Sequence, residues 1–239
     1  MIELIDNIGI DFLFGSQSAF LDHVALLLTN AYVWIPMFLA LFLLVIKNHD
    51  NMQQILLCLG CVALCLLIAS GTANFLVKPM VERLRPCNDP QYKYLACIAG
   101  NIHERDFSFF SSHAANTMAV ATFFTLLVRS SLLGMTLYAW SFINMWTRLY
   151  LGQHFITDII VGMLWGIVSA LIAYTLFRKM FQNISNSNKF VSTQYTSTGF
   201  SLLDIDVVVS AFFFTLLLIM IPLCDIIQTV FSIVSTIIG

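Results

Sequence analysis

Residues 148–158 read RLYLGQHFITD and join two long apolar runs of the chain. The stretch places three ionisable residues, Arg148, His154 and Asp158, at this junction. Ionisable groups are costly at the edge of a membrane helix, so they indicate a functional site there. His154 and Asp158 are four residues apart, which puts them on one face if they share a helix. The stretch therefore predicts two membrane helices that meet at a chemically active site.

The composition identifies the class of protein. Of the 239 residues, 59% are hydrophobic and 10% are charged, and the mean hydropathy is +0.87. Soluble domains have about 45–50% apolar and about 25% charged residues. This excess is too large for a buried core alone, so we expect an integral membrane protein. The net charge of -2 and the lack of a basic tract argue against a nucleic-acid partner and leave membrane lipids as the expected partners.

Six apolar segments predict the membrane helices, because a bilayer core about 30 Å thick requires about 20 apolar residues per helix. The segments are 22–46, 53–77, 113–129, 132–148, 156–177 and 206–232. Within the fifth segment, Gly162 and Gly166 form a GxxxG pattern that is typical of helix packing. We therefore expect an all-α polytopic protein with about six transmembrane helices, forming one membrane domain over residues 1–239.

Three further segments have distinct patterns. Residues 1–20 mix apolar with acidic residues, which is typical of an amphipathic helix at the membrane interface. Residues 178–205 are polar and predict a loop. The last apolar segment, 206–232, predicts an additional C-terminal transmembrane helix.

The connections between the segments fall into two sets on opposite sides of the membrane. Loop 78–112 and the turn near 149–155 lie on one side, and loop 178–205 lies on the other. If the cations nearest the membrane edge are held in a site, the remaining Lys and Arg residues place the second set in the cytoplasm. We therefore expect loop 78–112 to face the periplasm or exterior of a bacterial inner membrane.

The cysteines fall into two groups. Cys58, Cys61 and Cys65 recur at helical spacing inside an apolar segment, which favours packing over a redox or metal pair. Cys87 and Cys97 lie in a polar loop instead. A disulfide between these two is an open alternative if the loop faces an oxidising compartment.

Three polar clusters fall at expected helix ends on the same side. The first is KPMVERLRP at 78–86, with six residues between Lys78 and Arg85. The second is FSSH at 110–113, which opens a helix, and the third is the stretch quoted first. Each cluster alone could be an interfacial anchor or a helix cap. Their joint occurrence on one side favours a single site.

A site built from these clusters would bind phosphate. Lys78, Arg85 and Arg148 supply cations, and a guanidinium matches phosphate in a bidentate way. Ser111 and the backbone N–H groups at the following helix start add donors that the helix dipole favours. The nearby acidic residues lack the spacing of metal ligands, so we expect neither a metal nor another cofactor.

Two histidines could carry out the chemistry. Asp158 on one nitrogen of His154 would fix the tautomer and leave the other nitrogen free to attack phosphorus. His113 could protonate the leaving oxygen and later activate water. The residues therefore indicate phosphoryl transfer through a covalent intermediate.

The three clusters resemble the signature motifs of the type 2 phosphatidic acid phosphatase (PAP2) superfamily. The family pattern is Lys-x6-Arg-Pro, then Pro-Ser-Gly-His, then Ser-Arg-x5-His-x3-Asp, and the order and spacings match here. Phe110, Ser112 and Thr147 stand where the pattern has Pro, Gly and Ser. The resemblance extends over about 22–177 and implies a PAP2-type helical core there.

The resemblance implies a role for each matching residue. His154 would be the nucleophile that forms a phosphohistidine, with Asp158 as its orienting partner and His113 as the general acid. The phosphate would be bound by Lys78, Arg85, Ser111, Arg148 and the backbone amide of Ser112.

The resemblance also implies a metal-independent phosphatase acting on a lipid phosphate. We expect undecaprenyl diphosphate first, by analogy with compact bacterial relatives, with lipid A or phosphatidylglycerophosphate as alternatives. A lipid-to-lipid phosphotransferase would use the same intermediate and would release no inorganic phosphate. A transporter or an inactive scaffold is disfavoured, because the chain shows no repeats and keeps the residues that would react. Loop 87–109 is expected to shape head-group choice.

Overall fold

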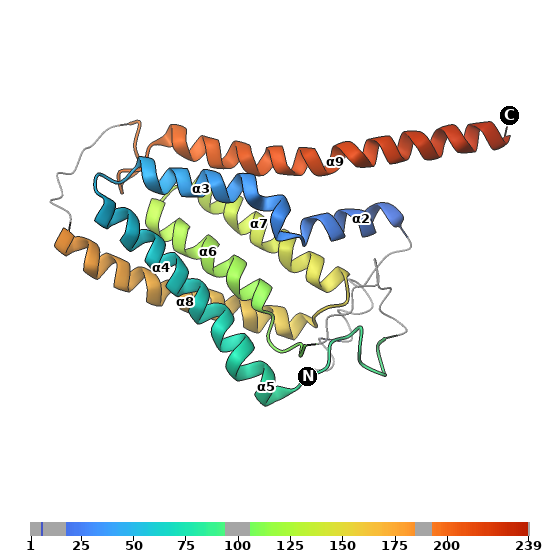
Figure 1. Cartoon of the computed structure of the whole chain (residues 1–239), viewed down its shortest axis with the longest axis horizontal. Helices are drawn as coiled ribbons and strands as arrows, with labels where there is room; N and C mark the ends of the chain where they lie inside the picture. The colour runs from blue at the N-terminus through green and yellow to red at the C-terminus, as the bar shows by residue number, and fades with distance from the viewer. Residues whose placement is uncertain (1–5, 7–17, 94–105, 185–192, 239) are drawn as a thin grey trace.

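The computed structural model describes residue 6 and residues 18–93, 106–184 and 193–238 of the chain, and its architecture is helical (Figure 1). Apart from one isolated bridge between Tyr195 and Ser201, these described ranges contain no β structure. The predicted all-α class is therefore confirmed.

The helical segments follow the predicted apolar segments closely. In chain order they are α2 (Ala19–Leu28), η1 (Ala31–Trp34), α3 (Ile35–Lys47), α4 (Met52–Gly71), η2 (Thr72–Val77), α5 (Lys78–Val81), α6 (Ser112–Val128), α7 (Ser131–Tyr150), α8 (Ile156–Ile184) and α9 (Leu202–Ile238). The segment η2 is a π-helical turn, and α4, η2 and α5 together form one helical run over Met52–Val81.

Three of the described helical segments are long and apolar enough to cross a membrane: Met52–Val81, Ile156–Ile184 and Leu202–Met220. The pair Phe20–Leu28 and Ala31–Lys47, bent by 67° at its break, would make a fourth. α6 is apolar but shorter. The count of six spans therefore stays a prediction.

The predicted segment 22–46 is not one straight helix. α2 ends at Leu28, and the Asn30 side chain accepts the Tyr32 N–H at 3.0 Å to begin η1. Such a local side-chain bond to the backbone competes with continuation of a helix. The Trp34 indole N–H donates to the freed Leu28 carbonyl at 2.9 Å. Hydropathy missed the break because apolar residues continue on both sides of Asn30.

The loop predicted over 178–205 is shorter in the structure. α8 continues to Ile184, and α9 begins at Leu202 and extends past both ends of the predicted 206–232. Arg178 and Lys179 are exposed on α8. Long polar side chains form helices readily, so polarity alone did not mark the end of the helix.

The cysteine and N-terminal predictions have different outcomes. Cys58, Cys61 and Cys65 are buried in α4, as expected for packing. Cys97 lies outside the described residues, so its pairing with Cys87 is untested. Most of the predicted interfacial helix at 1–20 also lies outside them.

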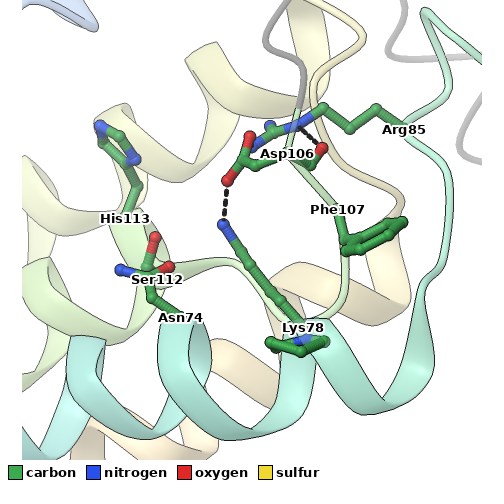
Figure 2. Close-up of a pocket in the computed structure, with 8 residues that line it drawn as sticks. Asn74, Lys78, Arg85, Asp106, Phe107, Ser112 and His113 are labelled. Carbon is green, nitrogen blue, oxygen red and sulfur yellow. Dashed lines mark hydrogen bonds and ion pairs between the residues drawn. The ribbon is translucent and has the colours of Figure 1, made fainter.

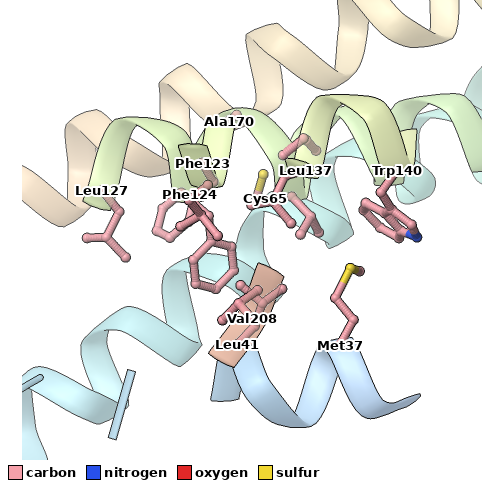
Figure 3. Close-up of a cluster of buried hydrophobic side chains, with 14 of the residues drawn as sticks. Met37, Leu41, Cys65, Phe123, Phe124, Leu127, Leu137, Trp140, Ala170 and Val208 are labelled. Atoms are coloured by element: carbon pink, nitrogen blue, oxygen red, sulfur yellow. The ribbon is translucent and has the colours of Figure 1, made fainter. Parts of the chain in front are cut away.

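α6 is the central helix and contacts α4, α7 and α8 (Figure 1). Its Phe123 and Phe124 share one buried apolar cluster with Leu41 of α3, Leu137 of α7 and Val208 of α9 (Figure 3). Burial of this kind stabilises a fold by about 25 cal/mol per Å² of apolar surface removed from water. The cluster thus fixes the helix that carries the second polar motif.

Two glycines let α8 approach α6 closely. A Cβ at Gly162 would lie 2.5 Å from the Ser111 carbonyl oxygen, and one at Gly166 would lie 2.4 Å from the Ala115 carbonyl oxygen. Backbone atoms cannot rotate away, so a side chain would force the helices apart. At this separation the Ser111 N–H donates to the Asp158 carbonyl at 3.1 Å. The GxxxG pattern therefore locks the second polar motif against the third.

Candidate active site

The first motif contributes Lys78, Pro79 and Arg85 to the lining of a cavity of about 340 Å³ at the end of the α4–η2–α5 run. Lys78 begins α5, which ends at Val81, and the left-handed φ of 49° at the capping residue Glu82 turns the chain. Lys78 and Arg85 are only 5% and 1% exposed, so the cavity receives two buried cations. The lining residues, drawn in Figure 2, are Asn74, Lys78, Pro79, Arg85, Asp106, Phe107, Ser112 and His113.

Asp106 bridges these two cations (Figure 2). Lys78 Nζ lies 2.5 Å from its Oδ2, and Arg85 Nη2 lies 2.5 Å from its Oδ1. Partial burial would raise the pKa of Asp106, but the Lys78 hydrogen bond and the Arg85 charge lower it to about 2. The motif spacings assign no role to Asp106, because it lies between the first and second motifs and belongs to neither.

His154 lies beside Arg85 in the turn between α7 and α8, and it is 1% exposed. Its Nε2 is 3.3 Å from Arg85 Nη1, and its Nδ1 is 3.6 Å from Asp158 Oδ2. The Ser108 hydroxyl lies 3.3 Å from Nδ1 and donates to the same carboxylate oxygen. At 3.6 Å the neutral ring and the Asp158 carboxylate face each other without a direct hydrogen bond, and the Ser108 hydroxyl contacts both. Nε2 lies beside Arg85, and His154 is not among the residues that line the cavity.

The charge of the surroundings favours a neutral imidazole. Burial, followed by the charges of Arg85 and Arg148, lowers the pKa of His154 well below its ordinary value. A neutral ring keeps the lone pair that a nucleophile needs. Arg148 is 3% exposed, donates from Nη1 to the Thr29 hydroxyl at 3.3 Å, and is not among the residues that line the cavity.

Asp158 is fully buried in the first turn of α8. Its Oδ2 accepts the Phe155 N–H at 2.9 Å, and its Oδ1 accepts from Arg83 Nη1 at 2.8 Å. The carboxylate thereby caps the start of the helix while it faces His154. These bonds hold one carboxylate oxygen toward the imidazole and give the other to a cation.

Arg83 connects this carboxylate to the N-terminal part of the chain. Its Nη2 lies 2.5 Å from Asp6 Oδ2, and Asp6 also accepts the Thr157 N–H at 3.1 Å. The guanidinium carbon stands 3.9 Å from the centre of the Phe155 ring. We infer that Arg83 positions Asp158. Sequence reasoning missed this role because Arg83 occupies an unspecified place in its motif, and only its charge could have signalled it.

The second motif brings two of its three polar residues to the cavity. Ser112 and His113 line the wall, whereas Ser111 is fully buried and is not among the lining residues. The Ser111 hydroxyl accepts the Ala114 N–H at 3.3 Å and so caps α6. Ser112 has no positive φ, so this backbone does not require the glycine of the family pattern.

The donors in the cavity suit an anion. Lys and Arg side chains donate hydrogen bonds and accept none, and the N-terminus of α6 adds partial positive charge. Among the described residues, no group of three His, Cys, Asp or Glu side chains could hold a metal ion. With a buried imidazole beside these cations, the arrangement can bind a phosphate and attack its phosphorus.

Comparisons with known proteins fit this chemistry. A family model described as "PAP2 superfamily" matches residues 55–182. A "Lipid A 4'-phosphatase" of Bacteroides thetaiotaomicron is 31% identical over 185 residues, covering 75% of this chain and 81% of that protein. A "Lipid A 4'-phosphatase" of Porphyromonas gingivalis is 27% identical over 164 residues, covering 68% of this chain and 69% of that protein.

Two solved structures are similar in fold. LpxE of Aquifex aeolicus has a TM-score of 0.52 and 21% identity, covering 73% of this chain and 92% of that chain. A transmembrane PAP2-type phosphatidylglycerolphosphate phosphatase of Bacillus subtilis has a TM-score of 0.52 and 20% identity, covering 78% of this chain and 87% of that chain. At these identities the likeness concerns the fold alone.

Proposed function

Since the chain belongs to the PAP2 superfamily and is a membrane lipid phosphatase, we propose that it hydrolyses a phosphate monoester of lipid A and releases inorganic phosphate. The observation that carries the choice of lipid is the 31% identity to a lipid A 4'-phosphatase over 81% of that protein. The second curated relative has the same name. These relatives favour lipid A, the alternative substrate, over undecaprenyl diphosphate, which was expected first only by analogy with compact bacterial relatives.

In the proposed complex the phosphate lies in the cavity against Lys78 and Arg85. Both cations are buried, and an anion in a poorly solvated site is attracted more strongly than in water. The N–H groups at the start of α6, including that of Ser112, add donors from the opposite wall. Arg148 contributes charge from outside the cavity, and Ser111 contributes by capping α6.

The proposed first step forms a phosphohistidine. His154 Nε2 attacks phosphorus, and the bond between phosphorus and the sugar oxygen breaks. His113 donates a proton to that oxygen as it leaves. Asp158 stabilises the positive charge that develops on the His154 ring, since its Oδ2 lies 3.6 Å from Nδ1.

The proposed second step releases the phosphate. His113, now deprotonated, takes a proton from a water molecule whose oxygen attacks the phosphorus. The phosphorus–nitrogen bond breaks and inorganic phosphate forms, which restores both histidines. A phosphotransferase would place a lipid hydroxyl where this water stands.

We further propose that the site opens at a membrane edge, on the face that the distribution of Lys and Arg residues places outside a bacterial inner membrane. The cavity residues come from helix ends and from the loop before α6. A head group lies at that depth, so the substrate can stay anchored by its acyl chains.

A panel of purified lipid phosphates in detergent tests the proposal. We expect release of inorganic phosphate from lipid A to exceed that from undecaprenyl diphosphate and phosphatidylglycerophosphate by about tenfold or more in kcat/KM. Mass spectrometry should show lipid A losing one phosphate. A reversed preference would overturn the choice of lipid, and a newly phosphorylated second lipid would identify a transferase.

The catalytic assignment needs a matched pair of variants. His154→Asn should abolish phosphate release, whereas His49→Asn, at a histidine bonded to the Val45 carbonyl away from the cavity, should leave it near the wild-type rate. Comparable turnover in the two variants would overturn the assignment of the nucleophile.

A further inference from the structure

The cavity contains an acid that its proposed chemistry does not use. Asp106 presents one carboxylate oxygen to Lys78 and the other to Arg85, each at 2.5 Å. These are the two cations that the proposed function assigns to the phosphate. A guanidinium and an ammonium bind carboxylate and phosphate oxygens through the same donors. The carboxylate and the phosphate therefore compete for one pair of cations.

The difference in burial shows which partner can move. Lys78 and Arg85 are almost fully buried, whereas the Asp106 side chain is 51% exposed. Arg85 Nε also donates to the Asp106 backbone carbonyl at 3.0 Å. Rotation of the Asp106 side chain can therefore free both cations while the backbone stays bound to Arg85.

We propose that Asp106 is a specificity-determining residue that admits phosphate monoesters and excludes phosphodiester head groups. The inference rests on the proposed function, because it takes the cavity to be the phosphate site. An incoming group must displace a carboxylate of charge near -1 from two buried cations. A phosphate monoester carries about -1.5 to -2 at neutral pH and can do so. A phosphodiester carries a single charge and gains little by the exchange.

This competition matters to an enzyme embedded in lipid. Most anionic lipids around a membrane phosphatase are phosphodiesters, and they reach the same depth as the substrate. Without a carboxylate beside them, the two buried cations would bind these phosphodiester lipids, and the lipids would inhibit the enzyme. Because the pKa of Asp106 is lowered to about 2, the competing carboxylate remains charged at every pH at which the enzyme would be assayed.

Two substitutions and one control separate the charge from the shape of this residue. Asp106→Asn keeps the shape and removes the charge, whereas Asp106→Glu keeps the charge. Glu82→Gln is the matched control, since it removes an exposed acid within the first motif that forms no ion pair in the described part of the chain. Inhibition by phosphatidylglycerol, a phosphodiester lipid, is measured in non-ionic detergent with a lipid monoester as substrate.

We expect Asp106→Asn to lower the inhibition constant for phosphatidylglycerol by roughly tenfold or more, because a hydrogen-bonded charge is removed from the competition. Asp106→Glu and Glu82→Gln should stay within about twofold of wild type. Equal inhibition of Asp106→Asn and wild type would overturn the inference, as would an equal gain in the Glu82→Gln variant.

Calorimetric titration with inorganic phosphate measures binding without turnover. It therefore distinguishes a failure of the inference about Asp106 from a failure of the proposed phosphate site. Tighter phosphate binding by Asp106→Asn than by wild type supports competition, even if that variant is slow. Weaker binding would show that Asp106 instead organises the cations, which overturns the inference alone. Failure of all four proteins to bind phosphate would overturn the phosphate site itself.

Discussion

Replacing Gly162 with alanine should disable the site without changing any polar side chain. The new Cβ would lie 2.5 Å from the Ser111 carbonyl oxygen, where ordinary contacts begin at 3.4 Å. α6 and α8 must therefore separate by about 1 Å, and a misplacement of that size costs about 100-fold in rate. Overpacking of this kind also costs about 1–3 kcal/mol of stability. The separation acts directly on the Ser111 N–H bond to the Asp158 carbonyl.

The assay pairs phosphate release with thermal unfolding in detergent, and Gly60→Ala is the control. A Cβ at Gly60 meets nothing within 4 Å, so alanine there should keep full activity and add about 0.5–1 kcal/mol of helix stability. We expect Gly162→Ala to be slower and to unfold at a lower temperature than Gly60→Ala. Indistinguishable activity and stability in the two variants would refute the close packing of α6 and α8.

Three further predictions test the electrostatics of the site. Arg83→Met should lower kcat about tenfold or more, since Asp158 loses a charged hydrogen bond worth about 1.5–3 kcal/mol. Arg83→Lys should recover part of the lost rate. Equal rates in the two variants would argue against a positioning role for Arg83. kcat/KM, which reports the free enzyme, should not be lost as pH falls through 6.5, because burial and the charges of Arg85 and Arg148 lower the pKa of His154 well below its ordinary value; loss of kcat/KM with a midpoint at 6.5 would contradict this. Activity should survive EDTA, and vanadate should inhibit it because vanadate mimics five-coordinate phosphorus. Dependence on added Mg²⁺ would contradict phosphate binding by Lys and Arg side chains alone.

The motif spacings were sufficient to predict much of the candidate site. Lys78, Arg85, Ser112 and His113 share one cavity because each lies at or beside a helix end on the same side of the bundle. His154 lies outside this lining but beside Arg85, because its turn joins α7 to α8. Helix periodicity and membrane thickness constrain such positions strongly, so the sequence alone could place them.

Other parts of the site have no periodic signal. Asp106 and Ser108 lie in the loop before α6, and their contacts reach Lys78 and Asp158 across long stretches of sequence. Asp6 reaches the site from still farther away. Loop conformation and side-chain pairing decide these contacts, and hydropathy carries no information about either.

The break between α2 and η1 shows the same limit within an apolar segment. Hydropathy counts apolar residues and predicts one helix through 22–46. The competing local hydrogen bond, in which the Asn30 side chain accepts the Tyr32 N–H, depends on a single residue. A single capping residue can therefore outweigh a favourable average.

Trapping the covalent intermediate tests the central claim most directly. The substrate is a radiolabelled phosphate ester with an activated leaving group, the enzyme is the His113→Asn variant, and the reaction is quenched in alkali, where phosphohistidine survives. An activated leaving group needs little protonation, whereas hydrolysis of the intermediate needs His113 as a base. The account predicts that label accumulates on His154, located by mass spectrometry. Label on another residue, or steady hydrolysis by a His154→Asn variant, would contradict it.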